Sequence, residues 1–167
     1  STGVPKGVML EHRNVVCFCQ WYQRYYDLDE TANVIAYASF GFDANIMDTY
    51  PALTVGGSLH IIPDEIRLDL LRLNDYFEAN DVTHAFMTTQ VGRQFADNID
   101  NHSLKHLSTG GEKLAAIRPP SYPFHNLYGP TETAVIATSF LIDGEYDNIP
   151  IGKALDNVKM YILDRYQ

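Results

Sequence analysis

Residues 82–109, VTHAFMTTQVGRQFADNIDNHSLKHLST, carry the clearest information on the fold class. The run VTHAFMT (82–88) is typical of a buried strand, TQVGRQFADN (89–98) of a helix and LKHLST (104–109) of a second strand. Short polar turns join these segments. Strands that alternate with helices of this length predict a parallel arrangement with helical crossovers.

The same alternation extends along the chain. Asp43 is placed to cap a helix that Gly56 would end, and Pro51 is expected to kink or shorten that helix. The other expected elements are helices at 14–26, 43–55 and 66–77 and strands at 33–40, 58–62, 123–129, 134–143 and 158–164. We therefore expect an α/β fold, a mostly parallel β-sheet with helices on both faces.

Composition restricts the kinds of partner. The 167 residues are 46% apolar and 20% charged, which is ordinary for one folded domain, and the net charge of −9 disfavours nucleic acid as a partner. Cys17 and Cys19 are too few and too close for a disulfide framework. No apolar run approaches the ~18 residues of a membrane span, so no membrane partner and a cytoplasmic location are expected.

The polar turns after the strands are candidate ligand sites. In open parallel sheets, ligands bind beyond the carboxyl ends of the strands. That rule selects the turns that follow Phe40, Met87, Leu107 and Leu127.

The stretch HNLYGPTET (125–133) follows one of these strands and carries the most specific combination of side chains. Pro130 suits the first position of a helix, so Thr131 and Glu132 are expected in its first turn. Each residue alone has an ordinary structural explanation, because acids favour a first turn and aromatic residues often only pack. Together, Tyr128 offers a face for a base, Thr131 a hydroxyl for an anion and Glu132 a carboxylate for Mg²⁺, as a nucleotide site requires.

Four segments resemble one enzyme family. NLYGPTET (126–133) resembles the NxYGPTE motif of the amino-acid adenylation domains of nonribosomal peptide synthetases, within the superfamily of adenylate-forming enzymes. STGVPKGVMLEHRNV (1–15) resembles the end of that family's TSGSTGxPKGVxxxHxN loop, FGFDANIMD (40–48) its FDxS region and STGGEKL (108–114) a later glycine turn. The motifs occur in the family's order, and the resemblance covers essentially the whole chain.

The resemblance implies a nucleotide site. The catalytic residues that the resemblance implies are Thr131, Glu132 and Lys6. Thr131 would hold the α-phosphate, Glu132 would bind Mg²⁺, and Lys6 would help to neutralise the leaving pyrophosphate. Tyr128 would stack on adenine, and Asn126 would hydrogen-bond its edge. The residues implied to bind ATP or AMP are Ser1, Thr2, Gly3, Gly110, Gly111, Glu112, Asn126, Tyr128, Gly129 and Thr131.

The resemblance also implies an amino-acid site. Asp43 would pair with the α-ammonium of the substrate, whereas without the resemblance it is better explained as a helix cap. The residues implied to bind the substrate are Asp43, Ala44, Met47, Phe86, Ser108, Gly110, Leu127, Val135 and Ile136. All of these residues except Asp43 would surround the substrate side chain, and only Ser108 among them is polar. A small neutral, mostly apolar amino acid is therefore expected, with a leucine-like one favoured.

The implied reaction converts an amino acid and ATP to aminoacyl-AMP and pyrophosphate. The product would pass to the phosphopantetheine thiol of a peptidyl carrier domain, and a condensation domain would be a further partner. Residues 1–167 contain no match to the family's ribose-binding aspartate, its hinge or its C-terminal catalytic lysine. The chain is therefore expected to be one subdomain of the large N-terminal domain, truncated at both ends and inactive alone.

Two other interpretations stay open. One is another adenylate-forming ligase, such as a D-alanine carrier ligase or an acyl-CoA synthetase, although Asp43 disfavours acyl and aryl substrates. The other is a non-catalytic binding module with the same fold. Three further classes fit poorly. A P-loop NTPase is disfavoured because STGVPKG does not match GxxxxGKS or GxxxxGKT, and a serine hydrolase because no GxSxG is present. A zinc site is disfavoured because the scattered histidines lack metal-site spacing, and they are expected at the surface.

Overall fold

The described residues build a seven-stranded sheet. The computed structural model describes Gly3 and residues 7–166, and the strand order is β2–β1–β3–β4–β5–β6–β7. The strands are β1 Asn33–Ala36, β2 Ser58–Ile61, β3 His84–Thr88, β4 His106–Gly110, β5 Phe124–Tyr128, β6 Thr138–Leu141 and β7 Lys153–Ala154. Strands β1 to β5 are mutually parallel, and β6 is antiparallel to both β5 and β7. The predicted mostly parallel sheet is confirmed.

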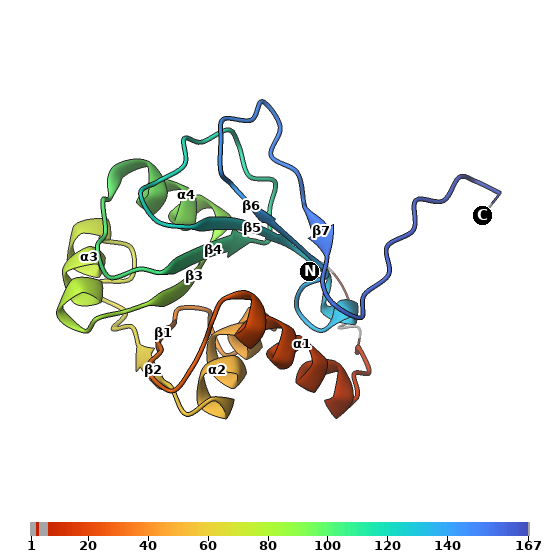
Figure 1. The fold of residues 1–167 in the computed structure, drawn as a ribbon, viewed down its shortest axis with the longest axis horizontal. Coiled ribbons are helices and arrows are strands. Elements are labelled where there is room, and N and C mark those ends of the chain that lie inside the picture. Colours follow the sequence, from red (N-terminus) through yellow and green to blue (C-terminus); the bar gives the residue numbers. More distant parts are fainter. Residues whose placement is uncertain (1–2, 4–6, 167) are drawn as a thin grey trace.

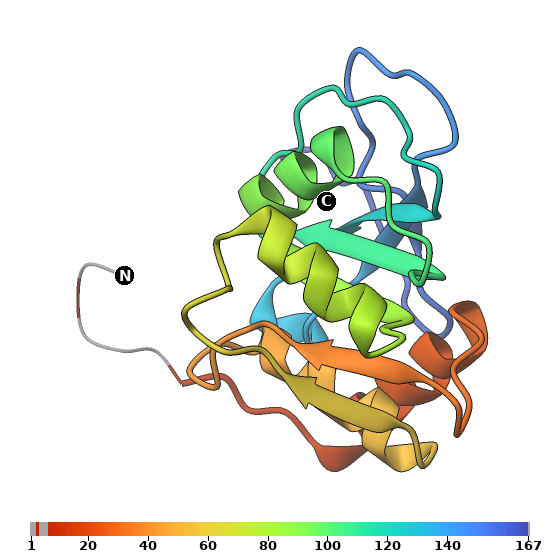
Figure 2. The same ribbon diagram turned by 90° about the vertical axis from the view of Figure 1, so that its left-hand side faces the viewer.

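Helices cover both faces of this sheet. They are α1 His12–Tyr25, α2 Ala44–Thr54, α3 Leu70–Ala79 and α4 Thr89–Asn98. Helices α1 and α2 lie below the sheet in Figure 1, and α3 and α4 lie on the other face, in front of the strands in Figure 2. None of the helices in the described part of the chain is long and apolar enough to cross a lipid bilayer.

Two apolar cores result, one on each face. Successive side chains of a strand point to opposite faces, so neighbours on one strand enter different cores. Phe86 of β3 packs in the core with α1 and α2, whereas the next residue, Met87, packs in the core with α3 and α4. Both faces of the central strands are therefore buried, which explains why they read as nearly continuous apolar runs.

Helix α4 packs very close to the sheet. A β-carbon at Gly92 would lie 2.8 Å from Oγ1 of Thr109 on β4, closer than real β-carbons approach another atom. The Thr109 hydroxyl in turn donates a hydrogen bond of 3.0 Å to the carbonyl of Met87 on β3. The strand–helix–strand unit at 82–109 is thus held together by a glycine contact and a buried hydroxyl.

The ends of two helices differ in detail from expectation. Helix α2 contains Pro51 and still reaches Thr54. Helix α3 begins at Leu70 rather than at residue 66, because Asp69 caps it and accepts a hydrogen bond of 3.2 Å from the Arg72 N–H.

The expected strand at 158–164 is wrong. These residues have no regular secondary structure, and the last strand is β7. The side chains of Met160 to Leu163 are exposed, and in Figure 1 the segment runs away from the sheet. An apolar run forms a strand only beside a neighbour that completes its hydrogen-bond ladder, and here no described strand lies alongside.

The segment between β5 and β6 is also less regular than expected. The helix expected after Pro130 is a single 3-10 turn, Thr131–Thr133. Ala134 and Val135 follow with positive φ angles of 58° and 83°, which a β-strand does not allow. The strand expected at 134–143 is therefore reduced to β6.

Candidate functional site

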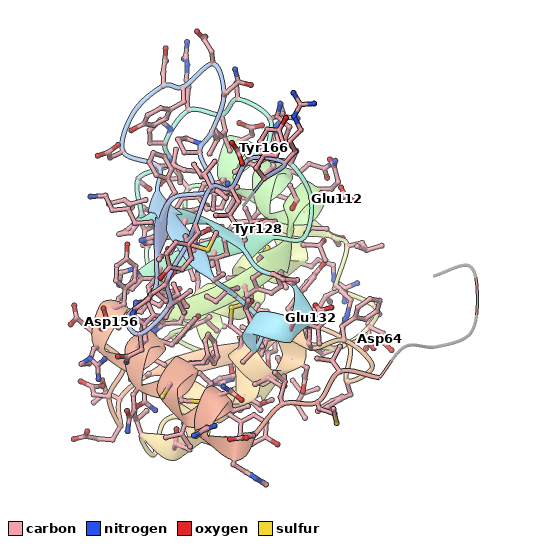
Figure 3. The ribbon with its side chains drawn as sticks, turned by 90° about the vertical axis from the view of Figure 1, so that its right-hand side faces the viewer. Asp64, Glu112, Tyr128, Glu132, Asp156 and Tyr166 are labelled. Atoms are coloured by element: carbon pink, nitrogen blue, oxygen red, sulfur yellow. The ribbon has the colours of Figure 1, made fainter. Side chains whose placement is uncertain are left out.

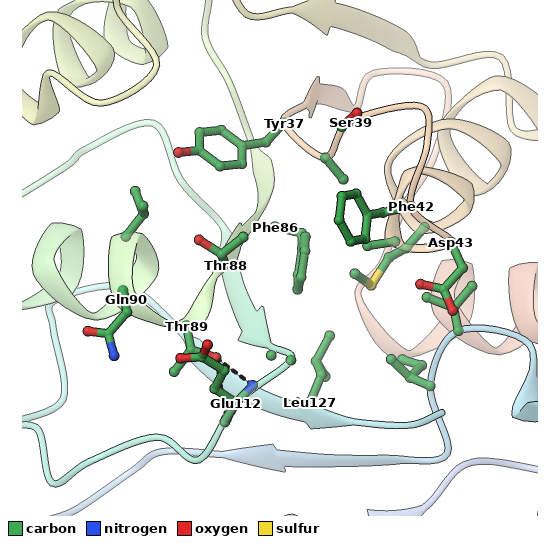
Figure 4. Close-up of a pocket in the computed structure, with 18 of the residues that line it drawn as sticks. Tyr37, Ser39, Phe42, Asp43, Phe86, Thr88, Thr89, Gln90, Glu112 and Leu127 are labelled. Carbon is green, nitrogen blue, oxygen red and sulfur yellow. Dashed lines mark hydrogen bonds between the residues drawn. The ribbon is translucent and has the colours of Figure 1, made fainter. Parts of the chain in front are cut away.

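A cavity of about 650 Å³ opens at the carboxyl ends of the parallel strands (Figure 4). Its position is the usual one for a ligand in this type of sheet, and its size suits a small molecule. The residues assigned from the sequence that line it are Asp43, Ala44, Met47, Phe86, Gly110, Gly111, Glu112, Leu127, Gly129, Val135 and Ile136. The lining residues that the sequence did not assign are Tyr37, Ala38, Ser39, Phe42, Arg67, Leu68, Thr88, Thr89, Gln90 and Val91.

Two glycines allow close contacts beside the cavity. A β-carbon at Gly110 would lie 2.7 Å from the carbonyl oxygen of Leu127 on the paired strand. A β-carbon at Gly129 would lie 2.3 Å from Cα of Ile136. Side chains at these positions would force β4, β5 and the segment after β5 apart, so both glycines have a packing function beside any role toward a ligand.

Asp43 does not act as a helix cap. It precedes α2, but its side chain makes no capping hydrogen bond. Instead, its carboxylate accepts a hydrogen bond from the hydroxyl of Thr131. This contact joins the loop between β1 and α2 to the turn after β5, and it brings together two residues that the sequence assigned to different ligand groups.

The glycine turn after β4 is fixed by Thr89. The Thr89 hydroxyl accepts a hydrogen bond of 3.1 Å from the Glu112 N–H and donates one of 3.3 Å to the Glu112 carbonyl, as Figure 4 shows for the first of these. Gly111 has a φ of 106°, a conformation that favours glycine. The turn is thereby held at the cavity while the carboxylate of Glu112 stays exposed.

Tyr37 and Arg67 form a reciprocal pair in the cavity wall. Nη1 of Arg67 donates to the Tyr37 carbonyl at 2.6 Å, the Tyr37 hydroxyl donates to the Arg67 carbonyl at 3.1 Å, and the guanidinium lies 5.2 Å from the ring centroid. Burial raises the pKa of Tyr37. No local motif connects these residues, and sequence analysis missed both.

Ser108 does not line the cavity. It is 1% exposed and pairs with Phe86, two residues below Gly110 on the same face of β4. The polar residue expected in the side-chain pocket therefore belongs to the layer beneath it.

The remaining assigned residues lie outside the cavity lining. Asn126 is buried, and its Nδ2 donates to the Pro150 carbonyl at 2.9 Å. Tyr128 is 48% exposed at the end of β5, and Glu132 is exposed on the turn that follows (Figure 3). Gly3 is exposed. Ser1, Thr2 and Lys6 lie outside the described residues.

The expectation that the histidines lie at the surface is wrong for His84 and His125, which are buried, and His106 between them is half-buried. His84, His106 and His125 form a row across β3, β4 and β5, with ring centroids 5.2 and 5.6 Å apart, against Tyr26. Burial lowers the pKa of His84 to about 4 and that of His125 to about 3, so both are neutral at pH 7. The three histidines meet because they lie on the same face of adjacent strands. The sequence does not reveal this, because it does not contain the strand register.

Comparison with known proteins assigns the family. The model of the AMP-binding enzyme family matches residues 1–167. The chain belongs to this family. It is 47% identical over 165 residues to bacitracin synthase 1 of Bacillus licheniformis. The matched region covers 99% of this chain and 3% of that protein. It is 45% identical over 163 residues to surfactin synthase subunit 2 of Bacillus subtilis, and the matched region covers 98% of this chain and 4% of that protein.

A solved structure of a peptide synthetase bound to AMP has a similar fold. Holo-AB3403, a four domain nonribosomal peptide synthetase bound to AMP and glycine, has a TM-score of 0.85 and 26% identity, covering 99% of this chain and 13% of that chain. The predicted adenylation-domain fold is thereby confirmed. The chain spans only 3% and 4% of the length of the two curated relatives, so it corresponds to a small part of these AMP-binding enzymes.

Proposed function

We propose that residues 1–167 form part of an adenylation domain that activates an amino acid with ATP to give aminoacyl-AMP and pyrophosphate. The observation that carries this proposal is the carboxylate of Asp43 at a largely apolar cavity, in contact with the hydroxyl of Thr131. Membership of the AMP-binding family and similarity to two peptide synthetases support it.

The contact between Asp43 and Thr131 explains how the substrate would be oriented. An ammonium paired with the Asp43 carboxylate makes a charge-assisted hydrogen bond. The substrate carboxylate would then lie close to Thr131, whose hydroxyl is proposed to hold the α-phosphate that this carboxylate attacks. Alignment of the two reacting groups can supply much of the rate enhancement in such a transfer. The apolar walls would exclude water, which would otherwise compete as the nucleophile.

The residues beside the cavity have the chemical groups that a nucleotide site requires. The exposed ring of Tyr128 can stack on adenine, and the turn at Gly110 to Glu112 forms the adjoining wall. In the described part of the chain, no three acidic, histidine or cysteine side chains gather to hold a metal ion. A single carboxylate such as Glu132 nevertheless suits Mg²⁺, which commonly takes its other ligands from phosphates and water and neutralises phosphate charge. Ser1, Thr2, Gly3 and Lys6 remain the predicted contacts of the pyrophosphate.

The substrate side chain would be neutral and apolar. The assigned apolar residues that line the cavity, Ala44, Met47, Phe86, Leu127, Val135 and Ile136, are proposed to surround this side chain. With Ser108 buried beneath them, these six residues present only apolar side chains, which favours a leucine-like substrate over a polar one. Discrimination between substrates that differ by one methylene would be weak.

The proposed partners follow from the reaction and the relatives. An aminoacyl-AMP is a reactive acyl donor, and a phosphopantetheine thiol on a peptidyl carrier domain is its proposed acceptor. A condensation domain would use the loaded carrier. Bacitracin and surfactin synthases, the relatives compared above, support a place in nonribosomal peptide synthesis.

The test is amino-acid-dependent exchange of pyrophosphate into ATP by a complete adenylation domain that contains residues 1–167. We expect the highest exchange with leucine and other branched or aromatic amino acids and none with aspartate, lysine or acyl and aryl acids. Exchange driven only by acyl or aryl acids would indicate a different adenylate-forming ligase. No exchange with any acid, combined with thermal stabilisation by AMP, would indicate a non-catalytic binding module.

A further inference from the structure

The backbone at Tyr37 and Ala38, directly after β1, is held entirely by side chains. Oδ2 of Asp48 accepts hydrogen bonds from the N–H groups of both residues, at 2.9 and 2.8 Å. The carbonyl of Tyr37 accepts from Arg67 at 2.6 Å, and the carbonyl of Ala38 accepts from Nδ2 of Asn45 at 3.2 Å. Each polar group of this backbone segment therefore has a partner although the ladder of β1 has ended.

Asp48 is an unusual residue for its position. It is 1% exposed in helix α2, and its other carboxylate oxygen, Oδ1, has no hydrogen-bond partner among the described residues. Burial of a carboxylate oxygen without a hydrogen-bond partner costs free energy. Stability alone therefore does not account for it, and its two short contacts to the backbone indicate what it does.

The segment that Asp48 holds leads to the cavity. Tyr37, Ala38, Ser39, Phe42 and Asp43 all line it, and α2 begins at the next residue. Asp48 lies in the first half of α2, so it connects the start of this loop to the helix at the loop's end. Both ends of the loop are thereby fixed relative to one another, which leaves the carboxylate of Asp43 a restricted set of positions.

We propose that Asp48 is a positioning residue that holds the loop at 37–43 so that Asp43 meets the ammonium of the substrate. This inference rests on the proposed amino-acid adenylation. Asp48 touches the backbone of the loop and acts on the substrate only through the loop residues that line the cavity, Asp43 among them. Displacement of a binding group by about 1 Å can lower catalytic efficiency by about 100-fold, so a residue that fixes the loop is able to control substrate use.

Three variants of the complete adenylation domain test the proposal. Asp48→Ala removes the acceptor, Asp48→Asn keeps one oxygen that can accept both N–H groups, and Asn101→Ala is the matched control. Oδ1 of Asn101 likewise accepts from two backbone N–H groups, those of Ser103 and Leu104 at 3.0 and 2.7 Å, but in a loop outside the cavity lining.

We expect Asp48→Ala to raise the KM for the amino acid about tenfold or more while the KM for ATP stays unchanged. Asp48→Asn should restore the amino-acid KM, and Asn101→Ala should lower the Tm without changing either KM. An unchanged amino-acid KM in Asp48→Ala would overturn the proposal. Equal effects of Asp48→Ala and Asn101→Ala on that KM would also overturn it, because the effect would then be a general consequence of lost stability.

Hydrogen exchange separates this proposal from the proposed function. If the wild-type domain activates no amino acid, the proposed function fails, and the amides of Tyr37 and Ala38 still report on Asp48. We expect faster exchange at both amides in Asp48→Ala, wild-type rates in Asp48→Asn and no change there in Asn101→Ala. Wild-type rates in Asp48→Ala would show that Asp48 does not hold the loop.

Discussion

The cores on the two faces of the sheet contain different kinds of side chain. On the face of α3 and α4, the central side chains are apolar, such as the fully buried Phe77 and Phe95. On the face of α1 and α2, buried histidines and the carboxylate of Asp48 lie among apolar side chains. The loop that Asp48 holds also lines the cavity. We infer that the first face mainly supplies stability, whereas the second combines packing with groups whose charge state depends on pH.

Removing Phe77 should produce the largest loss of stability. Phe77→Ala leaves a cavity in the core of α3 and α4, which should lower the free energy of unfolding by about 3–5 kcal/mol without changing its pH dependence. Urea unfolding followed by circular dichroism measures this, and Leu71→Ala, at an exposed position of the same helix, is the control. A loss below about 1 kcal/mol would mean that this face is not the main source of stability.

Replacing Asp48 should change stability with a defined pH dependence. Burial raises the pKa of Asp48 from 3.8 to about 7, with Tyr22 of α1 and Arg67 of the segment before α3 as the ionisable groups that face it. Between pH 4 and 7 the folded state keeps a proton that the unfolded state has lost, so this group makes stability fall as pH rises. Asp48→Asn should be more stable than wild type by about 2–4 kcal/mol at pH 8. Urea unfolding at pH 4 to 8 should show this difference shrinking on acidification, and a difference independent of pH would contradict the assignment.

The histidine row should produce the opposite pH dependence on the same face. Burial lowers the pKa of His125 from 6.5 to about 3, so below pH 6.5 the unfolded state binds a proton that the folded state does not, and stability falls as pH falls. The loss of stability between pH 7.5 and pH 5 should be about 2 kcal/mol smaller in His125→Phe than in wild type. Urea unfolding at the two pH values measures it. His102→Phe, at an exposed position, should leave the loss unchanged, and an equal effect of both variants would argue against the row as its source.

The smallest expected effect concerns the cap of α3. Asp69→Ala removes the acceptor for the Arg72 N–H and should cost about 1 kcal/mol. Asp69→Asn keeps an acceptor and should stay close to wild type in thermal unfolding. If both variants are destabilised equally, the charge of Asp69 matters more than its capping hydrogen bond.

The sequence predicts the elements better than their contacts. Periodicity at 82–109 was sufficient for the strand–helix–strand unit, because side chains on a buried helix and on a buried strand repeat differently. It failed at 158–164, where an apolar run has no strand beside it. The row at His84, His106 and His125 and the Tyr37–Arg67 pair depend on strand register and on contacts between distant segments, which local patterns do not contain.

The candidate site was predictable only in part. Motifs locate Asp43 and Thr131, and the structure adds that the two side chains touch although 88 residues separate them. No motif in the sequence assigns Asp48 a role. Its burial and its two backbone contacts are visible only in three dimensions.

Recognition of the amino-acid ammonium by Asp43 is the step on which the proposed function depends most. The most direct test compares leucine with 4-methylpentanoate, which has the same carbon chain and carboxylate but no ammonium, in pyrophosphate exchange by a complete adenylation domain containing this chain. We expect exchange with leucine, none with 4-methylpentanoate, and loss of the leucine-dependent exchange in Asp43→Ala. Equal exchange with both acids, unaffected by Asp43→Ala, would contradict this expectation.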